Sequence, residues 1–189
     1  MPSKMSGMDV RYELPTAIRS VKESWSRTAT KAGAICALFA VVEAQLLLFV
    51  KDPQNFPRAT SLAAIHALLI FTYSAFLFAI SGAVSSLVLV DVFGEIPVRA
   101  ARSQTMDSIT AGTIIANDAQ LLEMFGARRS LRWWRYHWAT TVACMSFSII
   151  IQILLYVWLQ EARSVQITAT CIAAFAVLPL FYFVPHSVT

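Results

Sequence analysis

The chain has 189 residues, of which 57% are hydrophobic and only 14% are charged, and its formal net charge is +4. Its mean hydropathy of +0.61 is far higher than a water-soluble domain of this length needs. The composition therefore excludes an ordinary soluble globular domain and indicates an integral membrane protein, although it does not reveal a specific activity.

The first segment, residues 1–31, is polar and basic and contains no apolar core of signal-peptide length. We therefore expect a cytoplasmic N-terminal segment, followed by a first span that acts as its own insertion signal.

Residues 32–184 predict an all-α transmembrane bundle of four helices. Crossing the hydrocarbon core takes about 20 apolar residues in a helix. Four stretches meet this need, at about 32–50, 59–90, 138–159 and 165–184. The second is longer than one span requires, so it should tilt, bend near residues 81–86 or project from the bilayer. Pro179 should kink the fourth, and residues 185–189 form a short tail.

The connection between spans two and three, residues 91–137, is predicted to hold a short helix at 117–126. Pro97 is expected to interrupt the exit from span two, and Asp91 to mark the membrane boundary.

Basic residues predict the orientation of the bundle. The N-terminal segment and the connection between spans two and three carry twelve of the fifteen Lys and Arg residues, and the two opposite loops carry Lys51, Arg58 and Arg163. Because positive residues accumulate on cytoplasmic loops, both termini should be cytoplasmic.

The stretch ARRSLRWWRYHW at residues 127–138 combines arginines with aromatic rings, as some nucleic-acid sites do. It adjoins an apolar span, however, so its arginines can meet anionic headgroups while its aromatic rings lie in the membrane interface. We interpret it as a membrane anchor and expect no nucleic-acid partner. The predicted anchor residues are Arg128, Arg129, Arg132, Trp133, Trp134, Arg135, Tyr136 and Trp138.

Glu43 lies near the middle of the first span and is the sharpest candidate for a functional residue. An ionisable side chain persists at this depth only if it faces protein or water. Small residues at 32, 36, 40 and 44 share one helix face beside it, which favours close packing against another helix, whereas Gln45 faces elsewhere.

Two hypotheses compete for Glu43. In the structural one, the carboxyl group is protonated or hydrogen-bonded to His66, Gln152 or a serine of span two, and it locks the bundle. In the functional one, copies of the chain assemble around an axis and Glu43 forms a ring of carboxylates that attracts cations.

Residues 26–46, SRTATKAGAICALFAVVEAQL, resemble the first span of Orai-type calcium channels. Span number, cytoplasmic termini, the Trp138–Ala139 pair and Pro179 are similar as well. The resemblance implies that Glu43 matches the selectivity-filter glutamate and Arg27 a basic residue at the cytosolic end of the pore. The sequence departs from the family in the spacing from Gly33 to Glu43, in the apolar LLLFV after Glu43, and in Gln152, which stands where a glutamate is expected. The motifs RWWRYHW and LLYVWLQE also resemble uncharacterised four-span membrane proteins of mushroom-forming fungi, which implies no activity.

No motif supports catalysis, a cofactor or a metal site. The sequence contains no G-x-S-x-G elbow, no phosphate-binding loop and no histidine pair. Cys36, Cys144 and Cys171 lie in apolar segments without metal-ligand spacing and are predicted to be reduced.

We therefore expect a non-enzymatic multi-pass protein that acts through helix packing and association with itself or a partner, in contact with anionic headgroups at its cytoplasmic face. The alternative is an oligomeric cation channel or transporter with Glu43 in the permeation path. The sequence does not indicate which membrane holds the protein.

Overall fold

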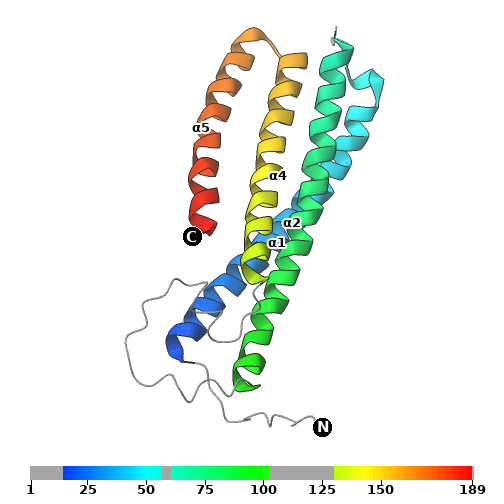
Figure 1. The fold of residues 1–189 in the computed structure, drawn as a ribbon. Helices are drawn as coiled ribbons and strands as arrows, with labels where there is room; N and C mark the ends of the chain where they lie inside the picture. The colour runs from blue at the N-terminus through cyan, green and yellow to red at the C-terminus, as the bar shows by residue number, and fades with distance from the viewer. Residues whose placement is uncertain (1–14, 57–60, 103–129, 189) are drawn as a thin grey trace.

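The computed structural model describes residues 15–56, 61–102 and 130–188 (Figure 1). Within these ranges the chain is helical and contains no strand, which confirms the predicted all-α class. The elements in chain order are α1 (Thr16–Lys51), the short 3-10 helix η1 (Pro53–Asn55), α2 (Leu62–Arg102), α4 (Leu131–Gln160) and α5 (Arg163–Val188).

Three helices, α1, α2 and α4, are long and apolar enough to cross a membrane, which agrees with the first three predicted spans. The predicted fourth span falls on α5, whose described apolar part, Arg163–Pro179, is shorter than this requirement. The fourth span therefore stays a prediction.

Helices α1 and α2 are much longer than their predicted spans. They have 36 and 41 residues, which correspond to about 54 Å and 62 Å, whereas the hydrocarbon core is about 30 Å thick. The start of α1 and the end of α2 lie at the same end of the bundle and project beyond α4 and α5 (Figure 1). The two helices continue there because Ile18 and Val21 of α1 belong to the same apolar cluster as Phe93, Ile96 and Ala100 of α2.

The prediction that Pro97 interrupts the helix is wrong, because α2 continues through Pro97 to Arg102. Proline removes one backbone hydrogen bond, but its φ angle is compatible with a helix. The burial of Ile96 and Ala100, on either side of Pro97, offsets the lost bond.

Helix α2 is the centre of the bundle. Both α1 and α4 pack along it, and α5 packs on α4. Residues 81–86, the expected place for a bend, lie inside the continuous helix and serve as a packing surface. A Cβ atom on Gly33 would lie 2.9 Å from Cβ of Ser86, and one on Gly82 would lie 3.0 Å from Sγ of Cys36. Small residues of both helices are therefore in contact, among them Cys36 of the small-residue face predicted on the first span, which lets the two backbones approach closely.

The connection between α1 and α2 is tied to the end of α4. Asn55 donates from Nδ2 to the carbonyl oxygen of Phe49 at 2.9 Å and thereby satisfies the end of α1. Gln160 of α4 donates from Nε2 to the backbone oxygen of Asn55, also at 2.9 Å. Helices α4 and α5 are joined by a tight turn at Glu161 and Ala162, and Trp158 donates to Oγ1 of Thr170 across it at 3.2 Å.

The predicted helix at 117–126 and most of the connection between spans two and three lie outside the described residues.

Replacing Gly33 by alanine should lower the free energy of unfolding by about 1–3 kcal/mol, because the added methyl group overlaps Ser86 and forces α1 and α2 apart. Gly94→Ala is the matched control: a Cβ atom there meets nothing within 4 Å, and alanine is the better helix former, by about 1 kcal/mol. Denaturation of the purified protein in mixed micelles measures both. Equal stability of the two variants would contradict the close approach at Gly33.

Candidate functional site

Helices α1 and α4 run in the same direction on α2, and side chains bridge the space between them. We call this contact the α1–α4 seam. It consists of three pairs, Trp25 with Arg135, Glu43 with Gln152, and Phe49 with Tyr156. Each residue on α4 lies about 110 positions after its partner on α1. This difference in residue number is nearly constant because both helices run in the same direction and rise by the same distance per residue.

Glu43 is buried inside a single chain. Its exposed fraction is 1%, and its side chain is hydrogen-bonded to that of Gln152, which is 4% exposed. Gln152 is one of the three kinds of partner that the structural hypothesis named. A second one, His66, is exposed. Gln45, two positions from Glu43, is exposed, and so it faces elsewhere than Glu43, as predicted.

The Glu43–Gln152 pair is incompletely satisfied. Oε2 of Glu43 and Oε1 of Gln152 are buried and accept no hydrogen bond from any described residue. Neither described ion pair of the chain, Glu23 with Arg27 or Glu95 with Arg99, involves Glu43. A buried polar atom without a hydrogen-bond partner lowers the stability of a protein by about 1–3 kcal/mol. A further hydrogen-bond donor beside this pair would therefore stabilise it.

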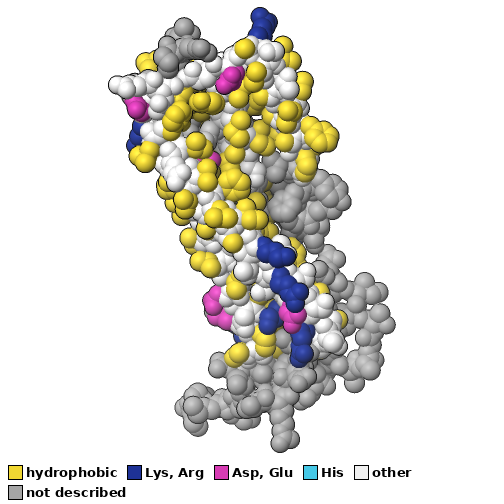
Figure 2. Space-filling model, turned by 180° about the vertical axis from the view of Figure 1, so that it is seen from behind, with side chains coloured by type: hydrophobic (Ala, Val, Ile, Leu, Met, Phe, Trp, Pro, Cys, Tyr) yellow, Lys and Arg dark blue, Asp and Glu magenta, His cyan; other side chains and the backbone are white. Residues whose placement is uncertain are grey.

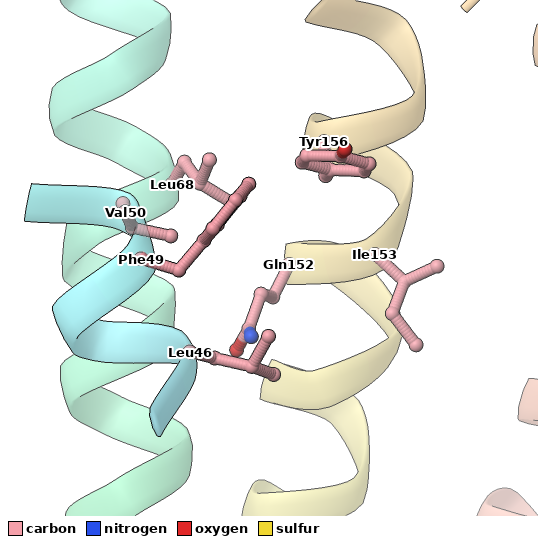
Figure 3. A pocket seen from close by; sticks show the side chains of 7 residues that line it. All are labelled: Leu46, Phe49, Val50, Leu68, Gln152, Ile153 and Tyr156. Carbon is pink, nitrogen blue, oxygen red and sulfur yellow. The ribbon is translucent and has the colours of Figure 1, made fainter. Parts of the chain in front are cut away.

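An apolar cavity of about 310 Å³ lies beside the pair, between α1, α2 and α4. Gln152 extends from α4 into it, and its amide group lies near Leu46 (Figure 3). Three aromatic rings pack at one end, with ring centroids 6.0–6.4 Å apart: Phe56 lies edge to face with both Phe49 and Tyr156, and these two are tilted against each other. Ile153, which is 53% exposed, lies at its outer side. The lining residues are Leu46, Phe49, Val50, Leu68, Gln152, Ile153 and Tyr156.

A second polar contact ties the middle of α2 to α4. Trp138 is 3% exposed and donates from Nε1 to Oγ of Ser86 at 2.9 Å. Ser86 in turn donates to the carbonyl oxygen of Gly82 at 2.8 Å. Since Ser86 also lies against Gly33, one serine joins the packing of three helices.

Arg135 and Trp138 differ from the predicted membrane anchors because both side chains are buried in the protein. Arg135 is 5% exposed, and its guanidinium carbon lies 4.1 Å from the centre of the Trp25 ring. This cation–π contact joins α4 to the projecting part of α1. The residue pattern of α4 alone does not predict this contact, because Trp25 belongs to a different helix.

The other anchor residues remain compatible with a membrane interface. Arg132, Trp133 and Tyr136 are exposed, and Trp134 is partly buried. The ring of Trp133 stacks on that of His137 at 5.2 Å. Arg128 and Arg129 lie outside the described residues.

Metal-binding groups are not clustered in the described part of the chain: no three His, Cys, Asp or Glu side chains there could hold one ion. Cys36 is buried, Cys144 is partly buried, and Cys171 is exposed, all as free thiols.

The α1–α4 seam and its cavity were not predicted as a unit. One signal in the sequence could have found them: the interval from Trp25 to Glu43 on α1 nearly equals that from Arg135 to Gln152 on α4. When polar and aromatic residues are separated by the same number of positions in two spans, the two helices can pair side by side in the same direction.

Gln152→Leu should lower the free energy of unfolding by about 1–3 kcal/mol, because it leaves the Glu43 carboxyl group buried without a partner. Glu43→Leu combined with Gln152→Leu should cost less than the sum of the single changes, since it removes both polar groups. The measurement is a double-mutant cycle in mixed micelles.

Gln45→Leu is the matched control for this cycle, because Gln45 is exposed on the same helix and should change stability by less than about 0.5 kcal/mol. Additive effects of the changes at positions 43 and 152 would contradict a direct interaction.

Comparison with protein-family models, with curated proteins and with solved structures finds no match for this chain. The resemblances to Orai-type channels and to four-span fungal proteins therefore stay predictions. Inferences about function rest on the geometry of the α1–α4 seam and on the surfaces of the helices.

Proposed function

We propose that the chain is a non-enzymatic, multi-pass membrane protein that acts through helix packing and through association with a second copy of itself. The observation that carries the proposal is the distribution of side chains on the helices. Polar groups of α1 and α4 turn inward to each other, as Glu43 and Gln152 do, while large apolar side chains turn outward.

The outward apolar side chains cover all four long helices and support a lipid-facing surface. Figure 2 shows them over most of one face, with most of the basic side chains that are visible there gathered toward one end. Monomeric soluble proteins rarely expose so continuous an apolar surface. Representative exposed residues are Leu38, Leu48, Leu77, Leu87, Phe147, Ile153, Ile172 and Phe175.

The proposed orientation rests on charge. Arg19, Arg27 and Lys31 form an exposed polar face on the projecting part of α1. They lie at the same end as Arg132, near the start of α4. Positive residues favour the cytoplasmic side and attract anionic headgroups. We therefore assign this end to the cytoplasm, with both chain ends there if α5 crosses the bilayer.

The proposed association surface is a groove of about 340 Å³ between α1 and α2. Helix α4 contributes no side chain to it. Its lining is mostly small: Ala29, Thr30, Gly33, Ala34, Ala37, Ala83, Ser86, Leu87 and Val90. In lipid, where burial of apolar surface drives little association, small residues allow helices to approach and pack. A helix of a second copy fits this surface.

The alternative, a cation channel with a ring of Glu43 side chains, needs these carboxylates to face a shared axis. Burial of Glu43 between helices of one chain supports the structural hypothesis instead. For Glu43 to reach such an axis, the hydrogen bond to Gln152 would have to break and α1 would have to rotate or move away from α4.

Ala34→Leu should fill the groove and weaken self-association by about tenfold, or 1.4 kcal/mol. Ala34 is exposed, so the fold of the single chain should be unaffected. Energy transfer between labelled copies, measured in vesicles at increasing dilution by lipid, gives the dissociation constant.

Ala174→Leu, on the exposed part of α5, is the matched control and should associate like the parent protein. A parent protein that stays monomeric at every dilution would refute the proposal. Equal association of both variants would refute the assignment of the groove.

A further inference from the structure

The cavity of the α1–α4 seam has the composition of a ligand site. Small-molecule sites are mostly apolar, measure about 300–1,000 Å³ and contain a few placed polar groups. This one measures about 310 Å³, and its lining is apolar except for Gln152 and the hydroxyl group of Tyr156. Because the lining comes from three helices, the cavity depends on the fold of one chain and not on self-association.

The polar end of the cavity has hydrogen-bond acceptors without a hydrogen-bond donor to satisfy them. Gln152, which is 96% buried, lines the cavity, and its Oε1 accepts no hydrogen bond from any described residue. Its partner Glu43 has an unsatisfied Oε2. A single group that donates two or more hydrogen bonds can satisfy both oxygens.

A primary ammonium group fits these two oxygens better than a hydroxyl group does. It carries three N–H donors and no acceptor, whereas a hydroxyl group has one donor and adds acceptor capacity of its own. It also supplies the positive charge that a buried carboxylate otherwise lacks, since Glu43 forms no ion pair with a described basic residue.

The rest of the ligand must be apolar. The wall beyond Gln152 is formed by Leu46, Val50, Leu68 and the rings of Phe49 and Tyr156. Exposed Ile153 and Phe49 lie where the cavity meets the surrounding apolar surface, so a ligand would enter from the lipid phase.

We propose that the cavity of the α1–α4 seam binds an aliphatic primary amine, with its nitrogen at Glu43 and Gln152 and its chain along the apolar wall. The amine completes the hydrogen bonding of the buried pair. It thereby fastens α1 to α4.

The test compares three eight-carbon amphiphiles on the full chain in lipid nanodiscs: octylamine, octan-1-ol and octyltrimethylammonium. Octylamine should bind at least about tenfold more tightly than the other two, because only it has both positive charge and N–H donors. Equilibrium dialysis measures binding, and the melting temperature should rise with octylamine. Equal binding of all three would overturn the proposal, since it would show partitioning only.

Two variants locate the site. Ile153→Trp should block the outer side of the cavity without touching the Glu43–Gln152 pair, and Glu43→Gln should remove the charge while keeping an amide at that position. Each should weaken octylamine binding by about tenfold or more. Ile172→Trp, on the exposed face of α5, is the control and should bind like the parent.

Photolabelling of the parent protein locates the bound amine even if Glu43→Gln fails to fold. An octylamine with a diazirine on its terminal carbon should label peptides that contain residues 46–50 or 152–156 of the parent protein. Labelling confined to other helices, or binding that is unchanged in Ile153→Trp, would refute the site.

Discussion

The Glu43–Gln152 hydrogen bond is the contact on which the arrangement of α1 and α4 depends. A carboxyl group as buried as that of Glu43 has no contact with bulk water, so it must find a partner inside the protein. Gln152 supplies that partner from a parallel helix. Once these two residues meet, Trp25 lies beside Arg135 toward one end of the bundle and Phe49 beside Tyr156 toward the other.

Helix α2 makes this long-range contact possible. Its small residues let α1 approach closely at Gly33 and Cys36, while Ser86 receives the Trp138 hydrogen bond from α4. The two outer helices are thus joined to a common support and touch each other mainly through side chains. Side chains that bridge a seam leave space between them, which explains why an apolar cavity lies next to the buried polar pair.

Helix positions and small packing faces could be predicted from the sequence because apolar runs and four-residue spacing act locally. The burial of Glu43 followed from the cost of a charge in the membrane. The inward turn of Arg135 and Trp138 could not be predicted, since it depends on which helix lies opposite them. The early start of α1 was missed because its residues are polar by composition. Its buried positions Ile18 and Ala29, with partly buried Val21 and Trp25 between them, nevertheless recur at helical spacing.

The most direct test asks whether the α1–α4 seam forms within one chain. Leu46 and Ile153 line the cavity from the two helices, so cysteines there, in a chain without its native cysteines, leave Glu43 and Gln152 intact. Two differently tagged versions are mixed in membranes and treated with a short bifunctional thiol reagent. A seam within one chain predicts that the reagent joins the two cysteines of the same chain. Cross-links found only between separate chains, seen as products that carry both tags, would contradict it.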